Sequence, residues 1–522
     1  MTNLTNLTNL LRNLIIGCFC MAGVMSTAMA EDMSLKQVIG TVLAHHPDLN
    51  ISQIDSAIAA TETTRLEGIL DPLVTATGTA SDEKIPTISD FQPSEQRIGQ
   101  LSGTISKPLA SGGTIGADFN YTRTSQGFRS PFAANLARFN PSYRNQININ
   151  YRRPLLKGAD RPDYNQALTG ARAGVEQANK QRRVVAHNLT LQAINAYYLL
   201  ASDDINIDIA KQAVRRAKKL LSYQRSRERF GLIEKSDRLQ AEALLAARAT
   251  DLQRARSVRL NDQNKLNRLM LRSADADIVV KHGDRLPALT PSIETAFKQA
   301  EQLRPELQVL KAQMQAADAQ LAIARDADQM QLDLVAKLGT RALDKAPLSA
   351  AAAGFSVHDH FASLSLELSD ALGRNTANAA IRKAILQRQR IEAQRISALK
   401  QIRDDISAAA TAIKSGLPTL ALARKQVKAE QRKFRAEMQR YRQGRSDTAT
   451  VVQFQGELSN AALNAELQEL TIELAEKQLA WAQGKLLYGL GLLQSDQSQS
   501  DRSQSDRPQT DITTTASSTD SP

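Results

Sequence analysis

The sequence predicts a mainly helical protein that also contributes strands to a membrane β-barrel, built as two tandem repeats of one plan. Three observations support this fold class. Matching strings recur at a constant spacing of 258 residues, alternating apolar and polar segments occur at matching places in both copies, and each copy continues into a helical stretch too long for a compact domain. The composition agrees, because 42% of the 522 residues are hydrophobic but only 4% are aromatic, which favours long helices packed through small and aliphatic side chains.

The composition also excludes several classes of protein. The mean hydropathy is −0.34 and no apolar run beyond residue 30 approaches the roughly 18 residues of a spanning helix, which excludes a polytopic helical membrane protein. The net charge of +12 is spread along the chain, and we interpret it as solvated helix faces. No helix-turn-helix, zinc-finger or ribonucleoprotein motif accompanies the charge, so we expect no binding to nucleic acid.

The first segment, residues 1–30, has the pattern of a secretory signal peptide. Arg12 precedes a short apolar run that ends in the small-residue cleavage site Ala28-Met29-Ala30. We therefore expect an exported mature chain that begins at Glu31. The run is short for a membrane anchor. Because the only two cysteines of the chain lie within 1–30, the mature protein is expected to have no disulfide, thiolate metal site or cysteine nucleophile.

Each repeat opens with a pair of short helices. In the first copy an amphipathic segment runs from Ser34 to Pro47, and in the second copy the equivalent segment runs from Ser292 to Pro305. A second helix rich in Ala and Gln follows each proline. The equal spacing of the two pairs is the main evidence for the repeat.

Strands are expected after each helix pair, because apolar and polar residues there alternate with a period of two. The clearest apolar series are Ile115, Ala117, Phe119 and Tyr121 in the first copy and Leu364, Leu366 and Leu368 in the second. Polar segments at 81–96 and 125–143 have the length of the external loops of an outer-membrane barrel. Periodicity alone does not distinguish such a barrel from a half-buried soluble sheet.

A long helical hairpin is expected after each strand region. Residues 164–228 contain no proline and would span roughly 100 Å as one helix, so they must pack lengthwise against other helices. The second copy repeats the plan with an outward segment at 374–443 and a return at 450–488. Pro418 lies inside the second outward segment, where we expect a kink or a change of helix.

The last residues differ from everything before them. They repeat Ser-Gln-Ser-Asp and end in Thr and Ser, a composition that predicts a disordered tail. The predicted organisation is a signal peptide at 1–30, first-repeat helices at 31–72, first strands at 73–154, a first helical hairpin and linker at 155–290, second-repeat helices at 291–330, second strands at 331–370, a second helical hairpin at 371–493 and the tail at 494–522.

This order of elements resembles the TolC-like outer membrane efflux protein family, the outer membrane factors of tripartite efflux or type I secretion systems. The resemblance covers roughly residues 33–493 and rests on the repeat together with several local strings. These strings are Asp71-Pro72-Leu73, Ser106-Lys107-Pro108-Leu109-Ala110-Ser111-Gly112-Gly113, Asn140-Pro141-Ser142-Tyr143, Arg153-Pro154-Leu155-Leu156-Lys157-Gly158 and Asn195-Ala196-Tyr197-Tyr198.

The resemblance implies a homotrimer that shares one β-barrel in the lipid of the cell outer membrane and one α-helical tunnel in the periplasm. It also implies a periplasmic adaptor protein and an inner-membrane transporter as partners. The family norm of four strands per chain predicts twelve in the shared barrel, although a possible extra hairpin through 98–105 and 115–121 leaves eighteen open. Asp370 stands where the family usually has proline, so the exit from the last strand departs from the pattern.

The resemblance also implies that the two helix-turn-helix tips form the periplasmic entrance and the adaptor-docking site. In the family a tyrosine precedes the glycine of the second turn, a basic residue follows it, and carboxylates six and nine residues beyond it ring the constriction. Here Tyr441 and Arg445 fit, but the carboxylate positions hold Thr450 and Gln453, so the acidic ring is missing. The candidate residues of this site are Phe230, Gly231, Asp237, Tyr441, Gly444, Arg445, Asp447 and Gln453. Our hypothesis is that bonds among Tyr441, Arg445, Asp447 and Asp237 hold the entrance closed.

The remaining motifs do not suggest catalysis. His358 and His360 share one strand face, but a zinc site requires further ligands that the neighbouring sequence does not supply, so we expect no metal and no cofactor. No catalytic triad or phosphate-binding loop stands out, and we expect no enzyme activity. The favoured function is an export channel for small molecules or proteins. The alternative is an exported coiled-coil structural or adhesion protein without a pore, and the sequence does not name the cargo.

Overall fold

The computed structural model describes residues 31–281, 292–356 and 359–486. The expected signal peptide, the expected tail at 494–522 and His358 lie outside the described residues. The chain divides into two compact units. The first contains the described residues up to Leu49 together with Val185–Arg304 and those from Gln401 onwards, and the second contains Asn50–Val184 and Pro305–Lys400.

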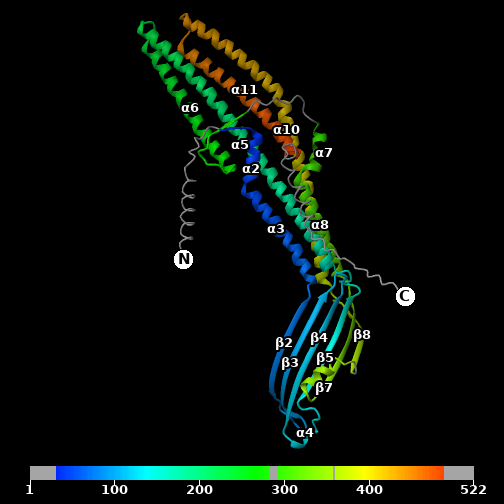
Figure 1. Cartoon of the computed structure of the whole chain (residues 1–522). Coiled ribbons are helices and arrows are strands. Elements are labelled where there is room, and N and C mark those ends of the chain that lie inside the picture. Colours follow the sequence, from blue (N-terminus) through cyan, green and yellow to red (C-terminus); the bar gives the residue numbers. More distant parts are fainter. Residues whose placement is uncertain (1–30, 282–291, 357–358, 487–522) are drawn as a thin grey trace, which may run out of the picture. The chain divides into compact units, whose positions relative to one another are not determined.

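The second unit contains an open antiparallel sheet (Figure 1). Its six strands, in sheet order, are β2 (Leu73–Lys84), β3 (Pro93–Pro108), β4 (Thr114–Phe128), β5 (Ser142–Pro154), β7 (Gln331–Asp344) and β8 (His360–Ser369). The short helices α4 (Pro131–Leu136) and α9 (Pro347–Ala353) follow β4 and β7. Both repeats therefore contribute to one sheet, and β2 and β8 are its edges.

The pairing of the strands gives the sheet one apolar and one polar face. One row of paired residues runs across all six strands and consists of Val74, Ile105, Ala117, Ile149, Leu338 and Ala362. Because side chains of a strand alternate between faces, the residues next to this row point to the other side. There Asn148 and Asn150 donate to Asp118 at 2.8 and 2.5 Å. Arg152 pairs with Asp333 at 2.7 Å on the same face.

The described strands differ from the sequence prediction in number. Six strands replace the expected four, because the possible extra hairpin is formed by β3 and β4. The expected long loops were also wrong in extent. β2 continues to Lys84 and β3 begins at Pro93, and β4 continues to Phe128. These segments are polar on both faces, so their sequence carries no period-two signal although their backbones pair.

The helices of the second unit pack through small residues. They are α3 (Pro47–Glu67), which continues into the short helix η1 (Gly68–Leu70), α8 (Pro305–Asp326) and the adjoining parts of α5 (Pro162–Arg229) and α10 (Asn375–Arg442). A Cβ built on Gly170 of α5 would lie 3.6 Å from the Cβ of Ala319 on α8. On its other side α8 buries Leu321 and Ala324 against Ala384 of α10. Three helices thus lie side by side.

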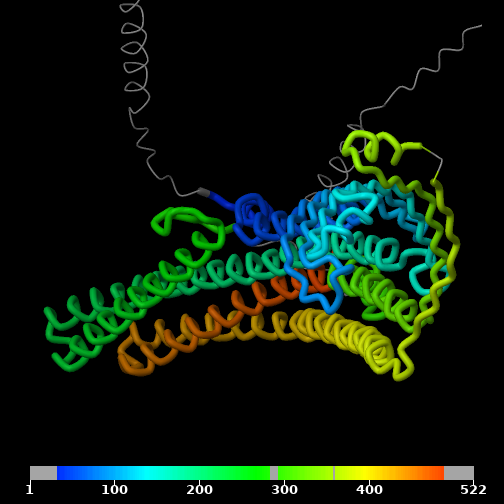
Figure 2. Tube along the Cα trace, turned by 90° about the horizontal axis from the view of Figure 1, so that it is seen from below, coloured from blue at the N-terminus to red at the C-terminus, as the bar shows by residue number. Residues whose placement is uncertain are grey.

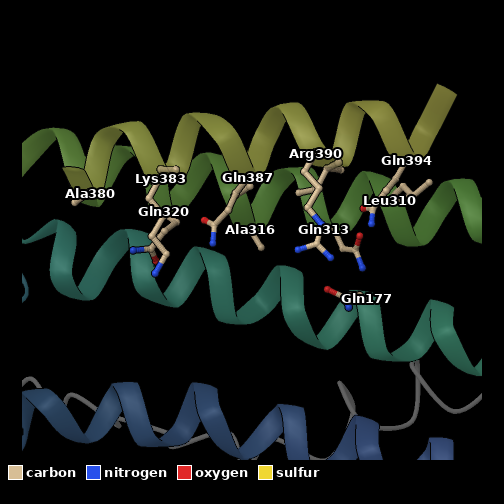
Figure 3. Close-up of a pocket in the computed structure, with 13 residues that line it drawn as sticks. Gln177, Leu310, Gln313, Ala316, Gln320, Ala380, Lys383, Gln387, Arg390 and Gln394 are labelled. Carbon is tan, nitrogen blue, oxygen red and sulfur yellow. The ribbon is translucent and has the colours of Figure 1, made fainter. Parts of the chain in front are cut away.

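The space between α5, α8 and α10 forms a polar groove of about 770 Å³ (Figure 3). Its polar lining consists of Gln177, Gln313, Gln320, Lys383, Gln387, Arg390 and Gln394. No carboxylate contributes to this lining. The groove is therefore an amide-rich and basic surface.

The first unit consists of the two helical hairpins and the helices beside them. Its helices are α2 (Leu35–His45), the remainder of α5, α6 (Lys235–Leu269), α7 (Ile293–Leu303), the remainder of α10 and α11 (Thr448–Ala482). The two outward helices each have 68 residues and the two return helices each have 35. Figures 1 and 2 show the hairpins side by side with their turns at the same end.

The core of the first unit surrounds a two-stranded parallel sheet of β1 (Glu31–Met33) and β6 (Ile278–Val280). The Tyr197 hydroxyl on α5 donates to the carbonyl oxygen of Met33 at 3.2 Å and accepts from the amide of Lys281 at 2.9 Å. Tyr197 is only 2% exposed. One tyrosine therefore joins both short strands to the long helix, which explains the Tyr197 of the family-like string.

Pro418 does not end the second outward helix, which runs through it to Arg442. Of the two expected outcomes, the change of helix was wrong and the kink stays a prediction. A helical proline removes one bond, here to the carbonyl of Lys414 four residues earlier. Pro418 and Lys414 both lie on the exposed side of α10, where water can satisfy that carbonyl. α10 also contains an 18-residue stretch of mean hydropathy 1.2, which by length and composition reaches the limit for crossing a membrane and is weak evidence for doing so.

Candidate functional site

The two turns that join the hairpins have the same backbone geometry. Gly231 and Gly444 adopt φ of 69° and 70°, a left-handed conformation that glycine reaches without a steric penalty. The amide of Leu232 donates to the carbonyl of Arg227 at 2.9 Å and that of Gly231 to Glu228 at 2.8 Å. The amides of Arg445 and Gly444 make the equivalent bonds. Both outward helices therefore end in a Schellman motif.

Behind the turns, one hydroxyl connects all four helices of the two hairpins. The Thr448 Oγ1 on α11 donates to Asp237 on α6 at 2.9 Å and accepts from the Gln224 amide on α5 at 2.6 Å. It also bonds the Tyr441 hydroxyl of α10 at 3.1 Å. A hydroxyl has one donor and two acceptor sites, so these three bonds use its whole capacity. We call this group, Gln224, Asp237, Tyr441 and Thr448, the tip junction.

The tip junction is buried in a small apolar cluster. Thr448 and Tyr441 are each 2% exposed, and Gln224 is fully buried. The Tyr441 ring lies 5.8 Å from that of Tyr223, and the other members of the cluster are Ala217, Leu220, Leu221, Ala241, Leu244 and Val451. This burial raises the pKa of the Tyr441 hydroxyl, so the side chain is a neutral hydrogen-bonding group at physiological pH.

The structure brings together only some of the residues that the sequence singled out. Asp237 and Tyr441 meet through Thr448, whereas Asp447 caps α11 by accepting from the amide of Thr450 at 2.8 Å. This backbone bond is the main reason that the pKa of Asp447 is lowered. The Arg445 side chain is exposed and makes no bond among the described residues. The four residues of the hypothesis therefore do not form one network within a single chain.

The other candidate residues lie at the surface of the tips. Phe230 is 76% exposed at the first turn, and Gln453 donates to Glu457 at 2.8 Å. Sequence reasoning missed Gln224 and Thr448. The available signal was the position of Thr448 directly after the helix cap Asp447, where a short hydroxyl side chain can face the crossing helices.

Positive charge is concentrated in two segments near the tips, whereas from the sequence we expected it to be spread along the chain. Residues 211–229 of α5 hold eight Lys and Arg against one Glu, and residues 424–442 of α10 hold eight against two Glu. The excess over these two segments is larger than the net charge of +12 of the whole chain. On the first hairpin, Arg238 pairs with Glu228 at 2.8 Å and Glu242 at 2.7 Å.

Metal-binding groups are absent from the described part of the chain, where no three His, Asp or Glu side chains gather. His360 lies at the start of β8. The arrangement at the tips is one of packing and hydrogen bonding, and it offers a way to hold helix ends together or release them.

Comparison with known proteins gives one family. Residues 296–485, which run from α7 to just beyond α11, match the family model described as outer membrane efflux protein. No curated protein matches the chain.

Solved structures extend the likeness to both repeats. The outer-membrane channel OprN is 15% identical over 86% of this chain and 90% of that chain, with a TM-score of 0.63. The outer membrane protein VceC of Vibrio cholerae is 17% identical over 86% and 96%, with a TM-score of 0.60. The CmeC outer membrane channel of Campylobacter jejuni is 14% identical over 86% and 85%, with a TM-score of 0.60. At these identities the likeness is one of fold.

Proposed function

We propose that the chain is a TolC-type outer membrane efflux protein and that three copies of it form one continuous export duct through the outer membrane and periplasm. The observation that carries this proposal is the open sheet. Its two edges, β2 and β8, have no partner strand among the described residues. An open edge exposes unpaired backbone groups that lipid does not satisfy, so neighbouring copies would have to pair them.

The two faces of the sheet fit a wall between lipid and water. The apolar row from Val74 to Ala362 would face the acyl chains, and the carboxylates and amides around Asp118 and Asp333 would face an aqueous lumen. Six strands from each of three copies give an eighteen-stranded barrel. A barrel of that size leaves a water-filled channel.

The helical hairpins would continue the lumen as a periplasmic tunnel whose inner end is the pair of tips. The tip junction would hold that end closed, and the tips would receive a periplasmic adaptor that connects the duct to an inner-membrane transporter. The junction supports a closed state because its bonds cross all four helices and its hydroxyl has no free capacity. The alternative of a pore-free structural or adhesion protein is not favoured by any observation.

Edge pairing between copies can be tested by site-directed crosslinking. No cysteine follows Cys20 in the sequence, so introduced cysteines would be the only ones in the mature protein. Thr77→Cys on β2 combined with Ser365→Cys on β8 should give, with a short bismaleimide, a ladder that stops at three chains. The matched control combines Ser365→Cys with Asn120→Cys on the central strand β4, and it should give no three-chain species.

Pore formation can be tested on the same preparation. The uncrosslinked protein should produce steps of conductance in a planar lipid bilayer. A stable monomer that neither crosslinks nor conducts would support the pore-free alternative and overturn the proposal.

A further inference from the structure

Two rows of basic side chains follow the outward helices toward the tips. The α5 stripe is Arg215, Lys218, Arg225 and Arg229, and the α10 stripe is Lys425, Lys428, Arg432, Arg435 and Arg442. All nine side chains are exposed. Most successive positions are three or four residues apart. The two longer steps, 218–225 and 435–442, each pass over one polar residue at the same spacing, Ser222 and Gln439. When these two positions are counted, the steps alternate between three and four residues, which keeps each stripe on one face of a supercoiled helix.

Among the described residues, the α10 stripe has no counter-charge and the α5 stripe has one. Every carboxylate within 211–229 and 424–442 is engaged by another residue: Glu228 with Arg238 at 2.8 Å, Glu430 with Lys433 at 2.8 Å and Glu437 with Arg440 at 3.6 Å. Of the nine stripe residues, only Arg225 has an ion pair among the described residues, with Glu242 at 3.1 Å. Like charges three and four residues apart destabilise a helix, so the stripes work against the stability of the hairpins.

The return helix α11 carries an acidic series of similar spacing, but it does not present that series as one exposed row. The acidic series of similar spacing on α11 is Glu466, Glu469, Glu473 and Glu476. Glu469 already pairs with Arg424 at 2.5 Å, and Glu473 is only 2% exposed. Half of this series is therefore engaged or buried, so α11 of a second copy would not present four free carboxylates to a stripe.

We propose that the two stripes are docking faces for an acidic, amphipathic helical hairpin of the periplasmic partner. This inference rests on the proposed function and specifies the chemistry of its adaptor. A helix with carboxylates at the same 3.5-residue spacing could follow a stripe over the roughly 26 Å between Lys425 and Arg442. Because the stripes occur on both outward helices, each chain offers two such faces.

The geometry favours a helix over an anionic membrane. A lipid surface would attract every exposed cation near the tips, including Lys219, Arg424 and Arg440 outside the stripes, whereas a helical partner would contact the stripe cations turn by turn. Electrostatic complementarity of this kind would set the choice of partner and the rate of association more than the final affinity.

The test uses the full-length trimer in detergent and a synthetic helical hairpin with Glu at a 3.5-residue spacing. The stripe variant is Lys428→Glu, Arg432→Glu and Arg435→Glu. The control variant, Arg390→Glu, Lys400→Glu and Lys414→Glu, makes the same change of charge at exposed positions of α10 outside the stripe. Binding should weaken at least tenfold in the stripe variant and less than twofold in the control. A hairpin with Lys in place of Glu should bind the stripe variant and not the parent protein.

Equal loss of binding in both variants, or no binding of the Glu hairpin by the parent protein, would overturn the proposal. Stronger stripe-dependent binding to phosphatidylglycerol vesicles than to the hairpin would assign the stripes to lipid instead. Trimer crosslinking and bilayer conductance are measured on the same variants. Both should be unchanged, and loss of either in the parent protein would count against the duct itself rather than against its partner.

Discussion

The Thr448 hydroxyl is the single group on which the two tips depend. Thr448→Val preserves the shape of the side chain but leaves Gln224, Asp237 and Tyr441 without a shared partner in a buried site. We expect the tip helices to lose about 3 kcal/mol of local stability, because buried polar groups without partners are costly. Hydrogen exchange of the amides near both turns should become faster. Thr471→Val, at an exposed position of α11, should leave exchange at the tips unchanged.

Tyr441 and Arg445 can be separated by their effects on the closed entrance. Tyr441→Phe removes one bond of the tip junction, whereas the Arg445 side chain is exposed and unbonded among the described residues. In bilayer recordings we expect Tyr441→Phe to raise conductance about twofold and Arg445→Ser to add little. A double variant that conducts much more than Tyr441→Phe would show that Arg445 holds the entrance through contacts between copies.

His187 is a buried histidine that packing keeps neutral. Its ring stacks on Trp481 at 4.6 Å, and neither ring nitrogen has a hydrogen-bond partner in the part of the chain that the structure describes. Burial, with a smaller contribution from Arg304, lowers its pKa from 6.5 to about 3. Below pH 6.5 the unfolded chain therefore binds a proton at His187 that the folded chain does not bind. The folded state keeps its full stability above pH 6.5 and loses stability as the pH falls toward 3.

His187→Phe should remove this pH dependence. The variant should be more stable by about 1 kcal/mol at pH 8, since no ring nitrogen is left unbonded, and the difference should grow at pH 5. Thermal unfolding at the two pH values measures it. His45→Phe, at an exposed position, is the control, and a destabilised His187→Phe protein at both pH values would show that the site has no room for the larger ring.

Two acidic side chains, one on α5 and one on α6, are in contact where these helices pack together. Asp203, 6% exposed, bonds Asp262, and burial together with that neighbour raises the pKa of Asp203 to about 6. The folded state therefore holds a proton on Asp203 at pH values where the unfolded chain has lost it. The stability that this proton contributes is complete below pH 3.8 and is lost as the pH rises through about 6. Asp203→Asn imitates the protonated form.

We therefore expect Asp203→Asn to stabilise the hairpin by about 1 to 2 kcal/mol at pH 8 and to have no effect at pH 4. Limited proteolysis of α6 at the two pH values would measure the change. Asp208→Asn, which removes an exposed ion pair with Lys211, should have little effect at either pH. Equal effects of Asp203→Asn at both pH values would contradict the raised pKa.

At the scale of helices and strands, features that depend on local sequence could be predicted, and features that depend on distant segments meeting could not. Periodicity located both long helices, with the absence of proline from 164–228 as added evidence for the first. Gly231 and Gly444 marked the turns, because these signals are local. The strand hairpin of β3 and β4 was only a possibility, since its outer ends at 81–84 and 93–97 are polar on both faces and pair through the backbone. Thr448 was missed because its role depends on four helices meeting, a long-range arrangement that no local pattern encodes.

For the whole molecule, the number of strands should set the width of the pore. In the row that crosses the sheet, Val74 of β2 and Ile149 of β5 share one face and one level, with β3 and β4 between them. Removing two adjacent antiparallel strands therefore leaves β2 and β5 antiparallel, in register and with the same face to lipid. Replacing residues 85–138 with Asn-Gly would join Lys84 to Phe139 by a two-residue turn suited to a hairpin.

This deletion removes β3, β4 and the short helix α4, so it should convert six strands per chain into four while leaving the long helices α5, α6, α10 and α11 untouched. Barrel diameter grows roughly linearly with strand number, so a trimer would close around twelve strands with about two-thirds of the original diameter. We expect the variant to remain a three-chain species on crosslinking between β2 and β8. Its limiting conductance should fall once the tips are opened by Thr448→Val, because only then does the barrel limit the current. Unchanged conductance in that background would mean that the extra hairpin does not line the pore.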